Sequence, residues 1–404
     1  MALVCKNFSD IITFTRASSA TYFDSGGVLQ TATTDTPRFD YDPSTLAARG
    51  LLIEEARTNS IRNNTMQGAV AGTPGTNPTN WAVTLTADGI TQEVSAVGTE
   101  NGIAYIDIRY YGTPTAGTNR SISFETVNQI AAISGQTWTE SVYVKLQAGS
   151  FSNTSTTLNV LGTNGTTGTE SFSSSAITST PSNLRQCRLS VTGTFANAGT
   201  THAQPRIRIG YTVGVAIDIT LRIGLPQLEL GAFATSVITT TTAAATRSAD
   251  VASVNTLSPW YNASNSTLFV DYVWEGLKSV AGQRIVVIDN GATTNYFGMT
   301  ATSGNTMQNP VVIASTTEAT NSTPTTTYAA NTSYKQAVAL ELNNSVGAIN
   351  GVAGTPDTVV NVPTGLTTMR FGASSAGVTS NIWFRRITYY PRRLSNAELQ
   401  TITA

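Results

Sequence analysis

The side chains that could perform acid–base or metal chemistry are few in this sequence. His202 is the single histidine and follows Gly-Thr-Thr, a context typical of solvated loops. A Ser-His-Asp triad would need this histidine, and no nucleophile-elbow motif accompanies it. The two cysteines, Cys5 and Cys187, cannot build a Cys/His metal centre with one histidine. We therefore expect neither a catalytic triad nor a metal site of this kind.

Carboxylates are the remaining candidates for catalysis, because glycoside hydrolysis places two of them across the cleaved bond. Acidic residues are scattered through the predicted strands, at Glu125, Glu140, Glu170, Glu229, Glu275 and Asp289. None of them forms a recognisable pair in the sequence. The second half of the chain also lacks the dense Asp/Asn loop that would predict a calcium ion. We expect a protein that is not an enzyme, with no cofactor and no metal.

Aromatic residues in loops point to a different chemistry, the stacking of rings on sugar faces beside amides and hydroxyls. The best candidate is Trp260-Tyr261, in a loop of Pro, Asn and Ser residues before a predicted strand. Tyr296 and the pair Tyr110-Tyr111 are weaker candidates for the same role. The alternative for each is packing in a core or a hinge.

Strands must position these side chains, because apolar and polar residues alternate with period two along most of the chain. Charged residues make up only 12% and the formal net charge is -1, so no basic surface indicates nucleic acid or an anionic membrane. No apolar run approaches the ~20 residues of a membrane span. The clearest predicted strands cover 104–110, 138–145, 187–191, 205–211, 217–223, 266–274, 284–288, 336–340, 347–351, 369–372 and 381–390.

These segments predict an all-β protein in which an N-terminal connector precedes two tandem antiparallel β-sandwiches and one short C-terminal helix. We expect an opening block at 1–64, a Gly/Pro-rich linker at 65–80 and a first module at 81–238. A Thr/Ala-rich linker at 239–265 then leads to a second module at 266–404.

Two local signals in the second module are specific. Asn350-Gly351 predicts a tight hairpin, because both residues tolerate positive φ. Ser395 followed by Glu398 has the spacing of a capping box and predicts the start of the terminal helix. The tryptophans that alternate with polar neighbours inside strands are predicted to be core residues: Trp138, Trp274 and Trp383.

The opening block concentrates charge in a chain that otherwise has little. Arg49, Glu54, Glu55 and Arg57 lie close together, with further arginines and aspartates around them. Arginine pairs readily with carboxylates through two parallel hydrogen bonds, which favours a compact, ion-paired connector. A solvated surface segment with weak ion pairs is the alternative. As a connector, these residues would also organise a homo-oligomer.

The order FTRASSATYFDSGG…PRFDYDP…RGLLIEEARTN, between Ile12 and Asn64, resembles the opening block of a family of tailed-bacteriophage virion proteins. Members are fibre, spike or head-decoration proteins that carry β-sandwich modules behind this block. The resemblance implies a place on the virion surface, assembly in the host cytoplasm and contact with other virion proteins.

Each module has a resemblance of its own. TESVYVK and QLELGAFATS, in the first module, resemble a carbohydrate-binding-like jelly roll. AINGV, MRFG and the ending WFRRITYYPRRLSNAEL resemble a laminin-G or concanavalin-type lectin sandwich. These resemblances imply two sugar-binding folds in tandem.

Our first hypothesis is a non-enzymatic tail fibre, spike or head fibre, trimeric, that contacts host surface polysaccharide. The alternatives are a purely structural decoration or adaptor protein of the virion and a capsule depolymerase. We expect a sugar beside Trp260 and Tyr261, because a virion-proximal opening block would leave the second module farthest out.

Overall fold

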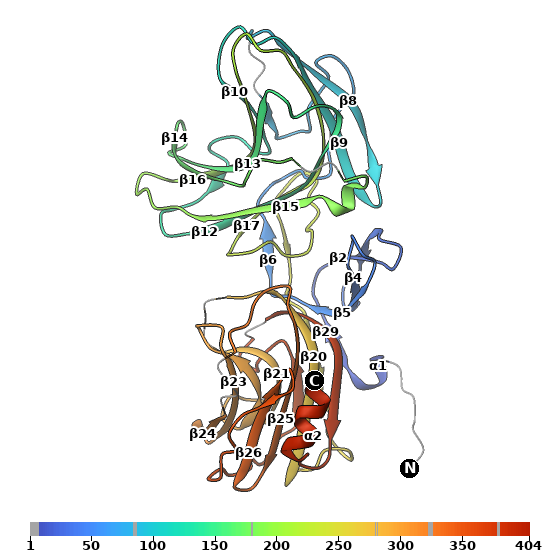
Figure 1. The fold of residues 1–404 in the computed structure, drawn as a ribbon, viewed down its shortest axis with the longest axis vertical. Helices are drawn as coiled ribbons and strands as arrows, with labels where there is room; N and C mark the ends of the chain where they lie inside the picture. Colours follow the sequence, from blue (N-terminus) through green and yellow to red (C-terminus); the bar gives the residue numbers. More distant parts are fainter. Residues whose placement is uncertain are drawn as a thin grey trace.

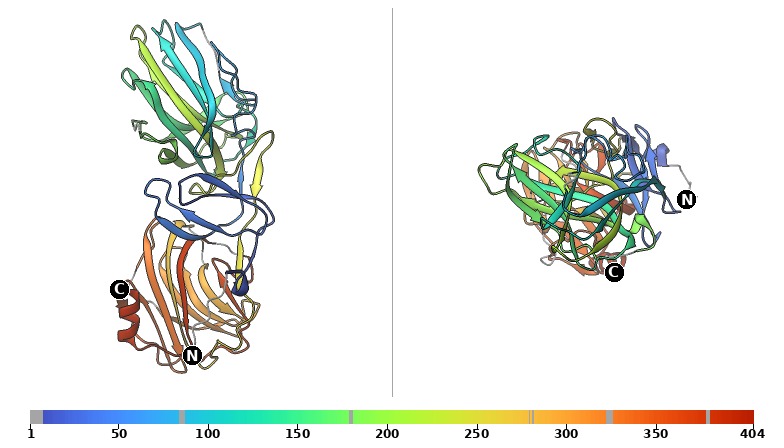
Figure 2. Two further views of the ribbon diagram at one scale, coloured as in Figure 1. Left: turned by 90° about the vertical axis from the view of Figure 1, so that its right-hand side faces the viewer. Right: turned by 90° about the horizontal axis from the view of Figure 1, so that it is seen from above.

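The computed structural model describes residues 8–83, 87–178, 181–278, 280, 282–321, 326–377 and 380–404, and Cys5 lies outside them. It confirms the all-β architecture. Two β-sandwiches are stacked end to end along the long axis of the molecule, with most of the opening block between them (Figure 1; Figure 2, left). Helix in the described residues is confined to α1 (Phe8–Ile11), the short 3-10 turn η1 (Leu184–Gln186) and α2 (Asn396–Thr403).

The first sandwich consists of two sheets with the strand orders β14-β13-β16-β10-β7, where β11 also pairs with β16, and β15-β12-β17-β9-β8. Alternate residues of each strand point into a common core, as Ile106 and Ile108 do on one sheet and Ile207 and Ile209 on the other. The strands are β7 Ala82–Val83, β8 Ile90–Glu100, β9 Ile103–Gly112, β10 Asn119–Ser123, β11 Ile130–Ala131, β12 Thr137–Gly149, β13 Thr154–Thr163, β14 Gly168–Ser173, β15 Arg188–Thr194, β16 His202–Tyr211 and β17 Ile217–Leu230.

The second sandwich also consists of two sheets, with the orders β1-β19-β28-β21-β22-β23-β24 and β27-β26-β25-β20-β29-β5-β4. Its core contains buried aromatic side chains, among them Tyr272, Trp274 and Phe297. The strands from the second half of the chain are β19 Val251–Val254, β20 Asn265–Gly276, β21 Gln283–Asp289, β22 Tyr296–Ala301, β23 Met307–Ile313, β24 Thr316–Asn321, β25 Ser333–Glu341, β26 Asn344–Ile349, β27 Val352–Ala353, β28 Thr368–Phe371 and β29 Asn381–Tyr390.

The opening block does not form a domain of its own, because its strands belong to sheets built with distant parts of the chain. In β5, Leu51, Leu52 and Ile53 pair with Phe384, Trp383 and Ile382 of β29. Strand β1 pairs with β19, and β6 with β18. The strands of the block are β1 Thr13–Thr15, β2 Ala20–Phe23, β3 Leu29–Ala32, β4 Arg38–Tyr41, β5 Ala48–Ile53 and β6 Arg57–Asn59.

The linkers lie elsewhere than the composition suggested. The predicted linker 239–265 contains β18 (Ala245–Arg247) and β19, so its irregular parts are the short stretches before and between these strands and the loop 255–264 that leads to β20. The predicted linker 65–80 packs on the first sandwich, where the Met66 side chain is part of the core. The Gly, Pro, Thr and Ala content of these segments therefore indicated turns, but it did not indicate a boundary between folded units.

A buried cluster of charged residues joins the opening block to the segment between β17 and β20. Asp250 pairs with Arg16 at 3.1 Å and with Arg38 at 2.5 Å, and Glu54 pairs with Arg38 at 2.6 Å and with Arg247 at 3.1 Å. We call these five residues the ion cluster. All five side chains are essentially inaccessible to solvent, so the ion-paired connector is the correct alternative and the solvated segment is not.

The specific local predictions are confirmed. Asn350 and Gly351 adopt positive φ between the paired residues Ile349 and Val352, as a tight hairpin requires. Helix α2 begins after Ser395, whose side chain accepts a hydrogen bond from the Glu398 amide in a complete capping box. Trp138, Trp274 and Trp383 are all buried. Neither α1 nor α2, in the part of the chain that is described, has the length and hydrophobicity needed to span a bilayer.

Candidate functional site

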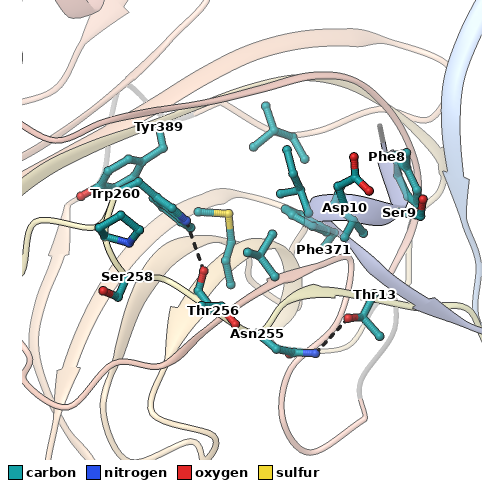
Figure 3. Close-up of a pocket in the computed structure, with 16 residues that line it drawn as sticks. Phe8, Ser9, Asp10, Thr13, Asn255, Thr256, Ser258, Trp260, Phe371 and Tyr389 are labelled. Atoms are coloured by element: carbon teal, nitrogen blue, oxygen red, sulfur yellow. Dashed lines mark hydrogen bonds between the residues drawn. The ribbon is translucent and has the colours of Figure 1, made fainter. Parts of the chain in front are cut away.

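A pocket of about 790 Å³ lies on the second sandwich between α1 and the loop that joins β19 to β20. We call it the Trp260 pocket. Figure 3 shows Trp260 and Tyr389 at one end and Phe8 and Asp10 at the other, with Phe371 between them. The volume is within the range of roughly 300–1,000 Å³ that small-molecule sites occupy.

The aromatic end of the pocket is held by mutual contact. The ring centroids of Trp260 and Tyr389 are 4.9 Å apart in an edge-to-face arrangement, and Tyr261 also packs against Tyr389. The indole nitrogen of Trp260 donates to the Thr256 carbonyl at 3.2 Å, which fixes the orientation of the ring. Trp260 is half-buried, so part of its ring remains open to the pocket. An aromatic wall held in this way is suited to stacking on a sugar ring.

The floor and the rim of the pocket have different polarity. Val254, Met369 and Phe371 form an apolar floor on β19 and β28. The rim carries short polar side chains, and Asn255 donates to the Thr13 hydroxyl at 3.2 Å (Figure 3). Asp10 is the charged residue among those that line the pocket. This combination of an apolar floor, an aromatic wall and a polar rim is typical of sites for small molecules.

Burial also controls the tyrosine hydroxyls at this end of the site. Removal from water raises the pKa of Tyr389 and of Tyr261 above the ordinary value for tyrosine. Both phenols therefore stay neutral near pH 7. The Tyr389 hydroxyl oxygen accepts a hydrogen bond from the Asn262 amide at 2.8 Å, which ties the β29 aromatic to the loop.

The structure brings together only part of the predicted sugar site. Trp260 lines the pocket directly, and Tyr261 supports it from the side. Tyr296 lies on β22 outside the pocket, with the Arg284 guanidinium over its ring at 4.6 Å. Tyr110 and Tyr111 belong to the first sandwich, far from Trp260 in the fold. The prediction is wrong for Tyr110, whose side chain is 1% exposed in that core and cannot offer a ring to a sugar.

The connector residues are engaged within the chain. Glu54 is in the ion cluster, and although burial alone would raise its pKa, Arg247 and Arg38 hold that pKa well below the usual range. Arg57 pairs with Glu55 at 2.7 Å and donates to the Leu230 carbonyl. Arg49 pairs with Asp42 at 2.8 Å. Because Glu54 is completely buried, the prediction that it organises an oligomer directly is wrong.

The argument from chain order is also wrong. The opening block was expected at the end of the molecule remote from the second sandwich. Instead, α1 lines the Trp260 pocket and β1, β4 and β5 complete the sheets around it. The block cannot act as a spacer, because β1 and β5 pair with β19 and β29 of that sandwich and β4 extends the same sheet beyond β5.

The other candidates for chemistry are dispersed. His202 begins β16, where its Nδ1 contacts the Thr201 hydroxyl at 2.8 Å. Cys187 is buried, and burial raises the pKa of its thiol to about 11, so it is a poor nucleophile. Among the described residues, no group of three or more His, Cys, Asp or Glu side chains is placed to hold a metal ion.

Sequence patterns did not identify some of the residues that line the pocket. Tyr389 was assigned to the last predicted strand. Because side chains alternate along a strand, Tyr389 and Ile387 must share a face of the sheet, but this alternation does not show that the face lines a pocket. Phe8, Asp10 and Thr13 come from a segment whose pattern is too short to reveal a helix and a strand at a pocket edge. Their partners lie more than two hundred positions later, at Asn255 and Thr256.

The fold and the pocket together define a tandem β-sandwich protein with a cleft at one edge of the second sandwich. No protein-family model matches the chain, and no curated protein matches it. Its structural neighbours include carbohydrate-binding modules and laminin G domains.

Three solved structures illustrate these likenesses. The CBM40 module of the Ruminococcus gnavus IT-sialidase, bound to α2,3-sialyllactose, has 16% identity over 35% of this chain and 84% of that chain, with a TM-score of 0.30. Domains LG4-5 of mouse laminin α1 have 10% identity over 74% and 95%, with a TM-score of 0.24. The NanB sialidase of Streptococcus pneumoniae has 13% identity over 37% of this chain and a TM-score of 0.31, and the match spans only 26% of that enzyme. At these scores the likenesses establish neither a family nor a shared ligand.

Proposed function

We propose that the chain is a non-enzymatic surface protein of a bacteriophage virion that binds a neutral unit of host surface glycan in the Trp260 pocket. The observation that carries the binding part is the pocket itself: an aromatic wall, an apolar floor and a rim of amides and hydroxyls. The virion part rests on the motifs of the opening block. Labelling the C-terminus of this protein on the virion would show whether it belongs to a tail fibre, a spike or a head fibre.

The absence of paired acids in the pocket favours binding over cleavage. Glycoside hydrolysis needs two carboxylates on opposite sides of a bond. Asp10 is the single carboxylate among the lining residues. A depolymerase acting in this pocket would therefore lack its second carboxyl group. Asp10 would also repel an acidic sugar, which is why the proposed ligand is neutral.

Replacement of Trp260 by alanine tests the binding site. Loss of a stacked ring costs about 1 kcal/mol or more, so Trp260→Ala should weaken binding of purified host polysaccharide several-fold per site. Phe8→Ala, at the other end of the pocket, should weaken it as well. Tyr296→Ala is the matched control, because it removes a half-buried ring of the same sandwich outside the pocket. Binding is measured per folded molecule by calorimetry on oligosaccharide fragments.

Two results would contradict the proposal. If Trp260→Ala lowers the melting temperature while binding per folded molecule is unchanged, Trp260 is a structural lid over the core. If the wild-type protein shows no saturable binding to host polysaccharide, the purely structural role in the virion becomes the better hypothesis.

A further inference from the structure

A second cavity, of about 320 Å³, lies where the opening block meets both sandwiches. We call it the junction cavity. The first sandwich contributes Tyr143 and Arg188, and the second contributes Trp383 and Glu275. The rim includes exposed residues such as Ser44 and Ser190, so the cavity opens to solvent. It is separate from the Trp260 pocket and shares none of its lining residues.

The junction cavity contains arginines without carboxylate partners. Arg188 donates to the Ser141 hydroxyl at 3.0 Å, and Arg185 donates to the carbonyls of Gly26 and Gly27. Neither forms an ion pair with any described residue, whereas most other arginines of the chain do. One terminal nitrogen of each guanidinium, Nη1 of Arg188 and Nη2 of Arg185, has no acceptor among the described residues.

The acids around the cavity do not neutralise these arginines. Asp40 already accepts from the Phe23 amide at 2.8 Å and from the Trp383 indole at 2.9 Å. Arg49 pairs with Asp42, and its guanidinium lies over the Trp383 ring at 4.6 Å. Burial, with the nearby charge of Glu54, raises the pKa of Glu275 well above its ordinary value. Three arginines (Arg49, Arg185 and Arg188) line the cavity, against the two acids Asp40 and Glu275. The cavity therefore keeps an excess of positive charge.

We infer that the junction cavity binds an acidic monosaccharide unit, with its carboxylate on Arg188 and Arg185. A guanidinium is the side chain best shaped to hold a carboxylate through parallel hydrogen bonds. The half-buried ring of Tyr22 and the exposed hydroxyls of Ser44 and Ser190 line the same cavity and supply contacts for the sugar ring. The cavity volume suits one sugar unit. The inference concerns a second site and a different ligand class, and it does not rest on the Trp260 pocket.

The wild-type protein provides the first test, by calorimetric titration with galacturonate, its methyl ester, galactose and sulfate. We expect galacturonate to bind and the methyl ester and galactose to bind about tenfold more weakly or worse, since a charged hydrogen bond is lost. This comparison does not depend on the folding of any variant. Sulfate that binds as tightly as galacturonate and competes with it would overturn the inference, because the site would then hold a bare anion.

A pair of matched variants locates the site. Arg188→Gln should weaken galacturonate binding about tenfold. Arg385→Gln is the control, because Arg385 also has no ion pair with the described residues and donates one bond to a serine hydroxyl, that of Ser333 at 3.0 Å, and neither residue lines the cavity. Equal binding by both variants and the wild type would overturn the inference. Trp260→Ala should keep galacturonate binding, and loss in that variant with retention in Arg188→Gln would refute the junction site while leaving the proposed function intact.

Discussion

Charged residues are few in this protein, and several of them stabilise its fold. The ion cluster holds Arg16, Arg38, Glu54, Arg247 and Asp250 away from water, and each carboxylate has two arginine partners. Buried charges are tolerated only when partners and hydrogen bonds replace the lost water. Removal of one member therefore leaves at least one buried neighbour with less charge compensation.

Asp250→Asn should be strongly destabilising. Asp250 accepts from Arg16, from Arg38 and from the Glu54 amide, so the neutral amide leaves the buried Arg16 without a carboxylate and Arg38 with Glu54 alone. We expect a loss of about 3–5 kcal/mol in the free energy of unfolding, measured by denaturant titration. Asp218→Asn, which breaks a half-exposed pair with Arg109, should cost less than about 1 kcal/mol. Equal costs would show that burial is not decisive.

Glu140 should make stability fall as the pH rises. It is buried in the first sandwich, and burial raises its pKa well above the ordinary value although the charge and the backbone amide of Arg206 act in the opposite direction. The folded state then holds a proton that the unfolded state has released above about pH 4.5, and each pH unit beyond that costs up to about 1.4 kcal/mol until the folded pKa is reached. Glu140→Gln should flatten this decline in unfolding experiments between acidic and neutral pH.

Glu170 provides a control of opposite sign. Burial alone would raise its pKa, but hydrogen bonds from the Ala196 and Asn197 amides and from the Thr200 hydroxyl together lower it. Its contribution is present above the unfolded pKa and is lost as the pH falls. Glu170→Gln should change stability in the acid range and leave the slope near neutral pH unaltered. A flat profile for the wild type near neutral pH would contradict the assignment for Glu140.

Sequence reasoning at the residue scale predicted the kind of interaction but not the partners. The concentration of Arg and Asp indicated ion pairs, and Glu54 is indeed in one. Asp250 lies about two hundred positions from Arg16 and Arg38 in the chain, and no local pattern links them. Trp260 was found from its loop context, whereas Asp10 and Tyr389 depend on a tertiary arrangement that period and composition do not encode.

At the scale of elements, the strands of the opening block are structural members of the second sandwich. β5 covers one side of β29, and β1 covers β19. Period-two alternation predicted strands in both modules, and these are present. The same signal gave no register between β5 and β29, because residues 51–53 and 382–384 are joined by backbone hydrogen bonds that any pair of apolar strands could form. The domain boundary at residue 64 was misplaced for this reason.

A chain that begins at residue 65 should not be stably folded. Its second sandwich would lose β1, β4 and β5, expose the edges of β29 and β19, and lose three members of the ion cluster. Unpaired edge strands promote association with other chains. We expect aggregation and a lowered melting temperature, measured by light scattering and calorimetry. The full chain is the control, and a soluble, fully stable chain from residue 65 would contradict the role of these strands.

On the scale of the whole molecule, the two sandwiches form one elongated particle with the opening block between them (Figure 2). The Trp260 pocket lies on the second sandwich, and the first sandwich is at the other end of the particle. The tandem arrangement was predictable from two zones of alternation separated by a Thr/Ala run. The interleaving of the block with the second sandwich was not, because it depends on contacts across most of the chain.

We expect the full chain to form a homo-oligomer, with a trimer as the proposed state. Several copies multiply weak sugar contacts through a raised effective concentration, and virion fibres benefit from this avidity. Because Glu54 is buried within one chain, the contacts between copies must use other surfaces than the ion cluster. Analytical ultracentrifugation at micromolar concentration measures the state, and a monomer there would contradict the proposal.

The pairing of β5 with β29 has a consequence for synthesis on the ribosome. The first sandwich is complete once Leu230 has emerged, so it can fold while the rest of the chain is still being made. Leu51–Ile53 cannot form their strand pairing until residues 382–384 have been synthesised. Contacts of such long sequence separation form slowly, and apolar segments that wait are prone to association. We therefore expect the second sandwich to fold last. Until it does, the opening block should be the part of the nascent chain that most needs chaperone protection.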